Sequence, residues 1–215
     1  MNGDDVARRV AALYPMRFLR AYVRWKVATD AVYDAVFERV RGTSDALVDV
    51  GCGVGILAAV LRQRGFAPSI TGVDHDARKI AVARSRGLPD ATFSAGDARD
   101  GLALRGTVVM LDLLHYFSDA DQASILARAA AGANLVIIRD ALRDGTWRYR
   151  MTYLQEAFAR GVRWLKAERL HFPARDTILG AFSGFDAEIA PLWGRTPFNN
   201  YLFVFRRSSA GMTKR

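Results

Sequence analysis

Apolar residues near the start of the chain recur at the spacing of an amphipathic helix. Between Met16 and Val27 they form one stripe, composed of Phe18, Leu19, Tyr22, Val23 and Val27. A second face of the same helix carries three arginines, Arg17, Arg20 and Arg24. Another helix is predicted to begin at Thr29 or Asp30 and to end at Gly42, because glycine commonly stops helices. Residues 1–44 are therefore expected to form a helical cap.

The period of the pattern then shortens to that of buried strands. Short apolar runs occupy residues 46–50, 69–74, 91–95, 107–111 and 135–138. Between them lie helical stretches at 56–64, at 77–86 and from Asp119 or Asp121 to Ala131. The strands are too apolar to face water, so the alternation predicts an α/β fold with a doubly wound, mostly parallel sheet covered on both faces.

Beyond Asp140 the pattern changes again. Residues 146–160 are predicted to be helical, with one side formed by Trp147, Met151, Leu154 and Phe158. A further helix is expected at 174–182, followed by strands at 187–192 and 200–205. The short connection between these two strands favours an antiparallel pair. Residues 45–215 are therefore expected to form one structural domain together with the cap.

A glycine cluster after the first strand carries the strongest chemical signal. Gly51, Gly53 and Gly55 lie between a strand and a helix, where the backbone can approach a ligand closely. Asp74 ends the next strand, 19 residues after Gly55, and a carboxylate there can accept both hydroxyls of a ribose. Asp49, just before the loop, suits a cationic amino group better than a pyrophosphate. These features favour S-adenosylmethionine over a dinucleotide.

Four segments resemble the successive motifs of class I S-adenosylmethionine-dependent methyltransferases. They are residues 49–55, Val73-Asp74, residues 96–98 and residues 111–117, which follow one another in the order and spacing of that family. The resemblance covers residues 45–140. It implies a Rossmann-like methyltransferase fold with a seven-stranded sheet, an antiparallel final strand and a variable N-terminal cap.

The resemblance also implies roles for individual residues. Asp49 would meet the amino group, the glycines would let the backbone approach the methionine part, and Asp74 would bind the ribose. Three alternatives stay open: Asp49 as a cap of its own loop, Asp97 as a helix N-cap, and Cys52 as a small filler. The predicted cofactor-binding residues are Asp49, Gly51, Cys52, Gly53, Gly55, Asp74, His75, Asp97, Ala98, Asp112 and Leu113.

His115, just past the fourth strand, is the first candidate for a general base, and Tyr116 is the second. A packing or orienting role for His115 is the alternative. No Asn/Asp-Pro-Pro turn follows the strand, and Cys52 lies in the wrong loop for cytosine methylation. The expected acceptor is therefore a small apolar or aromatic molecule, with O-methylation favoured. Candidate pocket aromatics are Tyr22, Trp25, Tyr33, Trp147, Tyr149, Tyr153, Trp193 and Phe198.

Other functions stay open as alternatives. The basic flanks would also suit an RNA or protein methyltransferase, although nucleic acid is not favoured. A different class would be a non-catalytic nucleotide-binding protein or an NAD-dependent oxidoreductase. One cysteine excludes an intramolecular disulfide, and three scattered histidines predict no metal site. No signal peptide or membrane span is recognised, so a cytoplasmic protein is expected.

Charge modifies this picture in the flanks. The chain has 31 basic and 22 acidic residues, net +9. Residues 45–140 are net −1, whereas residues 1–44 are net +3 and residues 141–215 are net +7. The basic flanks are open to three readings besides a solvated surface: peripheral contact with an anionic membrane at its inner face, contact with an anionic substrate or carrier protein, and an RNA-binding face.

Overall fold

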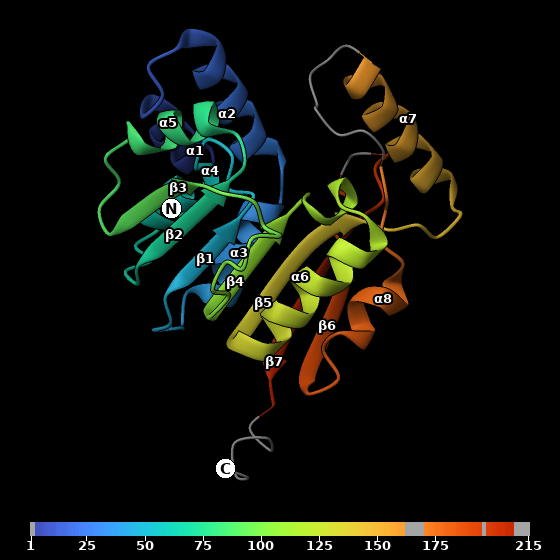
Figure 1. The fold of residues 1–215 in the computed structure, drawn as a ribbon. Coiled ribbons are helices and arrows are strands. Elements are labelled where there is room, and N and C mark those ends of the chain that lie inside the picture. Colours follow the sequence, from blue (N-terminus) through green and yellow to red (C-terminus); the bar gives the residue numbers. More distant parts are fainter. Residues whose placement is uncertain (1–2, 162–169, 195–196, 209–215) are drawn as a thin grey trace. The chain divides into compact units, whose positions relative to one another are not determined.

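The computed structural model describes residues 3–161, 170–194 and 197–208, and for residues 155–161 it describes the backbone alone. The chain divides into two compact units, residues 1–102 and 103–215, each of which is described by itself (Figure 1). Seven strands are present among the described residues, three in the first unit and four in the second.

The first unit consists of three N-terminal helices followed by alternating strands and helices. Strand β1 pairs in parallel with β2, and β2 pairs in parallel with β3. The helices α1 and α2 pack against each other, and Asp4 of α1 lies near Arg24 of α2, so the two run antiparallel. The elements are α1 (Gly3–Ala12), α2 (Arg17–Thr29), α3 (Val32–Val40), β1 (Leu47–Val50), α4 (Ile56–Gln63), β2 (Ile70–Asp74), α5 (Ala77–Arg84) and β3 (Ala91–Ala95).

Arg62, in the last turn of α4, fastens the loops that precede β2 and β3. Its guanidinium donates to the carbonyl oxygens of Pro68 and Pro89 at 2.9 and 2.7 Å. It also donates to the carbonyls of Phe66 and Asp90. One side chain thus satisfies four backbone acceptors at the amino ends of two neighbouring strands, which only the forked donors of arginine can do.

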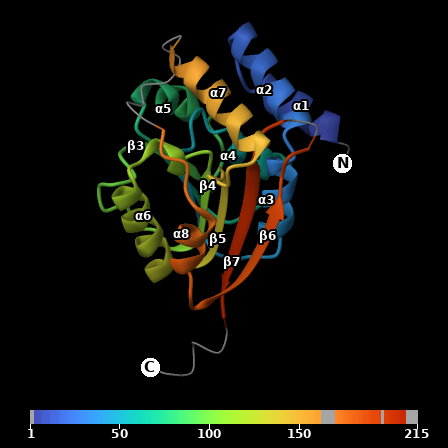
Figure 2. The same cartoon turned by 90° about the vertical axis from the view of Figure 1, so that its right-hand side faces the viewer.

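The second unit contains a mixed sheet. Strand β4 pairs in parallel with β5, β5 pairs antiparallel with β7, and β7 pairs antiparallel with β6. The last two, β6 and β7, are the red strands of Figure 2. The strand β5 is longer than predicted because its pairing with β7 extends to Ala141 opposite Asn200. The elements are β4 (Gly106–Leu111), the 3-10 turn η1 (Leu114–Tyr116), α6 (Asp119–Gly132), β5 (Ala133–Ala141), α7 (Trp147–Gly161), α8 (Arg175–Gly180), β6 (Phe185–Pro191) and β7 (Asn200–Arg207).

This strand set confirms the predicted fold class, mostly parallel with an antiparallel final strand. The three N-terminal helices fit the expected cap, of which the pattern had specified only α2 and α3. The division into a cap of residues 1–44 and a domain of residues 45–215 stays a prediction. No helix among the described residues is long and apolar enough to cross a membrane.

The apolar stripe of α2 differs from the prediction. Val23 is its only buried residue, and Leu19 and Val27 are half-buried. Phe18 and Tyr22, which the periodicity assigned to the same stripe, are exposed. The buried face of α2 is therefore narrower than the predicted five-residue stripe. Only Val23, with Leu19 and Val27 beside it, packs inward. On α7 the predicted side is also exposed at Trp147, Met151 and Leu154, while the side chain of Phe158 lies outside the described residues.

Gly72 of β2 has no room for a side chain. A Cβ atom at this position would stand 2.5 Å from the ring of Phe93 and 2.9 Å from Cys52 Sγ. We expect Gly72→Ala to lower the free energy of unfolding by about 1–3 kcal/mol, because overpacking forces neighbouring side chains aside. Urea denaturation followed by circular dichroism measures this. Gly42→Ala is the matched control, since a Cβ there meets nothing within 4 Å; equal effects of both changes would contradict the argument.

Candidate functional site

In the first unit, the loop after β1 is held by the strand next to it. The N–H groups of Gly51 and Cys52 both donate to the carbonyl oxygen of Val73, at 2.7 and 3.0 Å. Gly55 then starts α4 with a φ of 78°. A Cβ at Gly55 would stand 3.2 Å from both Ala83 and Phe93, so the turn requires glycine for conformation and for space.

Asp74 ties this loop to the end of β2. Its Oδ2 accepts the N–H of Gly53 at 2.9 Å, and its Oδ1 accepts the N–H of Asp76 at 2.9 Å. His75 is exposed, with Nδ1 3.5 Å from Asp74 Oδ1. The structure thus brings the glycine loop, Asp74 and His75 together at the carboxyl ends of β1 and β2.

Asp49 is the most unusual group of this unit. The residue is 2% exposed, and its Oδ2 has no hydrogen-bond partner among the described residues. Burial, and secondarily the charge of Asp74, raises the pKa of the Asp49 carboxyl to about 7. A buried carboxylate with an open oxygen strongly favours a cation, because a positive charge would offset its lost hydration. The alternative role of Asp49, capping its own loop, finds no support at Oδ2.

Asp97 and Ala98 follow β3. The Asp97 carboxylate accepts the backbone N–H and the Nε of Arg99, both at 2.9 Å, and pairs with Nη2 at 2.6 Å. These bonds lower the pKa of Asp97. No helix begins here among the described residues, so the alternative role of Asp97 as a helix cap is wrong. Ala98 is buried.

Cys52 behaves as a filler in this unit. It is buried, and burial raises the pKa of its thiol. Its Sγ lies against Gly72, close enough that a Cβ on that glycine would stand 2.9 Å away. A nucleophilic role is not supported, because burial and the charges of Asp49 and Asp74 disfavour the thiolate.

Tyr14 was missed by the sequence pattern. This fully buried residue follows α1 and donates its hydroxyl to the carbonyl oxygen of Val54 at 3.1 Å. The guanidinium of Arg86 lies over its ring, 4.7 Å from the centroid. Tyr14 therefore joins the N-terminal helices to the glycine loop. An aromatic residue just before a proline was the available signal, but it has no helical periodicity.

In the second unit, the predicted residues lie just beyond β4. Asp112 has a φ of 52°, its N–H donates to the carbonyl of Arg139 at 2.8 Å, and its carboxylate pairs with the Arg139 guanidinium. Leu113 precedes the turn η1, which contains His115 and Tyr116. Asp112 thereby has its own cationic partner on β5.

His115 is 3% exposed and is held from three sides. Its Nδ1 lies 2.6 Å from Oδ1 of Asp140, a fully buried carboxylate. The imidazole stacks on Phe172 and lies next to Tyr116, with centroid distances of 5.3 and 4.1 Å. Because Asp140 accepts the proton on Nδ1, the lone pair of the neutral ring lies on Nε2.

Asp140 also organises the backbone around His115. Its Oδ2 accepts the N–H of Leu114 at 2.8 Å, and its Oδ1 accepts the N–H of Ala141. Gln122 of α6 donates to the carbonyls of Leu114 and Phe117, both at 3.1 Å. In the sequence, Asp140 marked only the point beyond which the pattern changes, just after the strand predicted at 135–138. Its position beside the predicted base was not readable without the sheet register.

The candidate pocket aromatics occupy different environments. Tyr33 is buried, whereas Tyr22, Trp25, Trp147 and Tyr153 are exposed. Tyr149 meets Phe172 edge to face at 5.6 Å, and Trp193 meets Tyr201 in the same way at 5.8 Å. No cluster of three or more potential metal ligands exists among the described residues.

A family model described as "Methyltransferase domain" matches residues 47–133. Trans-aconitate 2-methyltransferase of Escherichia coli is 46% identical over 54 residues, which is 25% of this chain. The match spans only 21% of the length of that curated relative.

Two solved structures extend the likeness to nearly the whole chain. Magnesium protoporphyrin IX methyltransferase from Synechocystis PCC 6803 with bound SAH has a TM-score of 0.65 at 19% identity, covering 96% of this chain and 94% of that one. An amino pentose methyltransferase from Micromonospora echinaspora with bound SAM has a TM-score of 0.62 at 17% identity, covering 91% and 98%. Residues 47–133 therefore match the methyltransferase-domain family model, and the chain has the fold of class I S-adenosylmethionine-dependent methyltransferases, as its motifs predict.

Proposed function

We propose that this chain transfers a methyl group from S-adenosylmethionine to a small-molecule acceptor. The observation that carries the proposal is Asp49, a buried carboxylate with one oxygen open, placed directly before the glycine loop. A dinucleotide would bring a negatively charged pyrophosphate to this place, which Asp49 would repel. The cationic amino group of S-adenosylmethionine would instead be stabilised.

The other residues of the first unit fit the remaining parts of this cofactor. Asp74 already accepts two backbone N–H groups, and each of its carboxylate oxygens has a second lone pair for a ribose hydroxyl. Asp97 and Ala98 are proposed to contact the adenine, with Asp97 sharing its oxygens with Arg99. Gly51, Cys52, Gly53, Gly55 and His75 complete the proposed set in this unit, and Asp112 and Leu113 stay predicted cofactor residues.

A small acceptor is supported by the proteins that this chain resembles. Their names specify trans-aconitate, magnesium protoporphyrin IX and an amino pentose, none of which is a macromolecule. The turn after β4, residues 112–115, also lacks the proline pair found in enzymes that methylate adenine or glutamine amino groups.

Transfer to oxygen is favoured by the His115–Asp140 pair. S-adenosylmethionine supplies an activated methyl group on a cationic sulfur, so the protein mainly positions the acceptor. A hydroxyl acceptor must also lose its proton, which His115 would take at Nε2. Asp140 would hold the ring in the required tautomer and stabilise the imidazolium, through its 2.6 Å contact with Nδ1.

Cofactor binding tests the proposal most directly. Isothermal titration calorimetry with S-adenosylhomocysteine should show binding that weakens at least tenfold in Asp49→Asn, because the amide cannot neutralise an ammonium group. Glu38→Gln, an exposed carboxylate on α3, is the control and should bind like the unchanged protein. If the chain ignores this ligand and binds NADH, it is an oxidoreductase or a nucleotide-binding protein instead.

The affinity should also depend on pH through Asp49. Its pKa of about 7 means that the carboxyl is largely protonated at lower pH. A bound ammonium group favours the ionised form of the Asp49 carboxyl. The affinity for S-adenosylhomocysteine should therefore fall as the pH drops below 7, approaching about a tenfold loss per pH unit. The ligand's α-amino group stays protonated over this range. The same titration of Asp49→Asn should be flatter, and identical slopes would contradict the assignment.

The acceptor class can be tested by following the methyl group. Incubation with tritiated S-adenosylmethionine and a lysate should place the label in an organic extract rather than in precipitated RNA or protein, because the turn after β4 lacks the proline pair of enzymes that methylate adenine or glutamine amino groups. The control is the Asp49→Asn variant, which should incorporate less label. Label confined to RNA or protein would establish the alternative function.

The roles of His115 and Asp140 can then be measured with the labelled acceptor. We expect His115→Gln and Asp140→Asn each to lower kcat at least tenfold while leaving affinity for S-adenosylhomocysteine within about twofold. If His115 is the base, its loss should also remove the fall of kcat at low pH. The control is His171→Gln, a partly exposed residue near Asp119. Unchanged kcat in His115→Gln would reduce His115 to a packing role.

A further inference from the structure

Helix α2 presents most of its surface to water although much of that surface is apolar. Phe18, Trp25 and Met16, just before the helix, are 73%, 63% and 55% exposed. Exposed aromatic residues gathered on one short helix exceed what isolated surface residues explain, so this face is expected to meet a partner.

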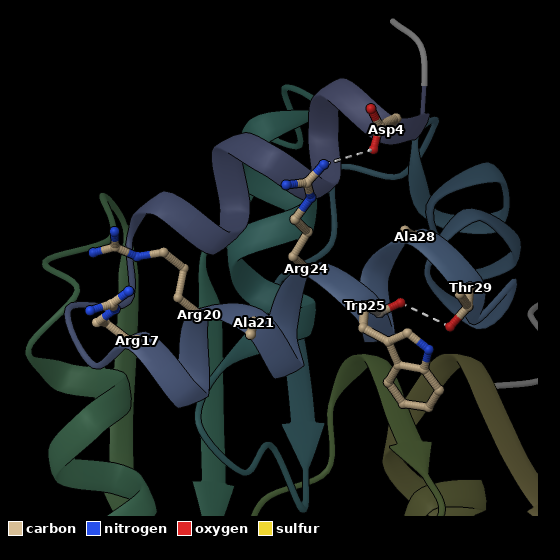
Figure 3. Close-up of a pocket in the computed structure, with 8 residues that line it drawn as sticks. All are labelled: Asp4, Arg17, Arg20, Ala21, Arg24, Trp25, Ala28 and Thr29. Atoms are coloured by element: carbon tan, nitrogen blue, oxygen red, sulfur yellow. Dashed lines mark hydrogen bonds and ion pairs between the residues drawn. The ribbon is translucent and has the colours of Figure 1, made fainter.

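A row of arginines accompanies these residues on the same helix. Arg17, Arg20 and Arg24 line an open pocket of about 560 Å³ together with Ala21 and Trp25. Figure 3 shows the arginine side chains on one side of α2 and the Trp25 ring on another. The helix carries four basic and no acidic side chains, so the partner is expected to be anionic.

Neighbouring groups hold two of these three arginine side chains in place. Arg20 donates its Nε to the carbonyl oxygen of Tyr14 at 2.9 Å, and Arg24 lies 4.0 Å from Asp4 on α1. Only Asp4 among the pocket residues is acidic. The positive charge of the three arginines is therefore largely unbalanced within the pocket.

We propose that α2 is a docking helix for an anionic membrane surface. Helices with aromatic residues on one face and arginines beside it lie in the plane of a bilayer, where the rings enter the headgroup boundary and the guanidinium groups meet anionic lipids. Trp25 and Tyr22 are the residue types preferred at this boundary. The proposal goes beyond methyl transfer and does not depend on it.

Other occupants fit the helix less well. A second copy of the chain, related by a twofold axis through this face, would bring one arginine row against another. Single-stranded nucleic acid could meet the arginines and stack on Trp25, but it would leave Phe18 and Met16, both highly exposed, without an apolar environment. A lipid surface accommodates all of these side chains together.

Vesicle flotation with the full chain tests the proposal. The chain should float with phosphatidylcholine vesicles that contain phosphatidylglycerol, should float much less with phosphatidylcholine alone, and should be released by high salt. Arg17→Glu with Arg24→Glu should weaken binding to the anionic vesicles about tenfold or more. This double variant spares Arg20, because Arg20 supports the carbonyl of Tyr14.

Two further variants separate charge from insertion. Arg105→Glu with Arg143→Glu makes the same change in net charge at exposed positions outside α2 and should bind vesicles like the unchanged chain. Phe18→Ser with Trp25→Ser should also reduce flotation while leaving the charge intact. Circular dichroism and binding of S-adenosylhomocysteine verify that each variant is folded.

Three results would overturn the proposal. The first is equal flotation with neutral and anionic vesicles, and the second is an equal loss in the control variant Arg105→Glu with Arg143→Glu. The third is tighter binding to a single-stranded RNA oligonucleotide than to anionic vesicles at the same salt, with the loss in Arg17→Glu, Arg24→Glu confined to the RNA. Each of these would assign the face to another partner or to none.

Discussion

The hydrogen bond from the Gly53 N–H to Asp74 Oδ2 determines the chemistry of the first unit. It fixes the loop after β1 to the end of β2 and assigns Asp74 a stable place for its negative charge. Asp49 then lies buried near a carboxylate that is already stabilised, and it has no comparable donors at its Oδ2. Among the described residues of this unit, Asp49 is therefore the carboxylate that a bound cation would stabilise most.

The second unit uses the same principle with different partners. Asp140 is fully buried, yet its two oxygens accept the N–H groups of Leu114 and Ala141 as well as the imidazole of His115. A buried carboxylate is tolerated where enough donors surround it. Here those donors include the group whose orientation matters, so the requirement to satisfy Asp140 also sets the position of His115.

The sequence predicted those parts of the fold in which burial or backbone conformation directly determines the residue type. The strands β1, β2, β4 and β5 are mostly buried apolar runs because both of their faces are covered, whereas β3 buries only Phe93 and departs from this expectation. Gly55 is glycine because its turn has a positive φ and little space for a side chain. The exposure of Phe18 was not predictable, since periodicity shows which residues share a side but not how wide the contact is. The role of Asp140 depended on the register of β5, which no local pattern contains.

The clamp formed by Arg62 has a consequence for how the first unit responds to ligands. By holding the loops before β2 and β3 through four carbonyl oxygens, it immobilises one end of these strands. The glycine loop at the opposite end is itself held by hydrogen bonds to Val73 and Asp74. Because both ends are fixed before a ligand arrives, binding costs little additional ordering entropy in this unit.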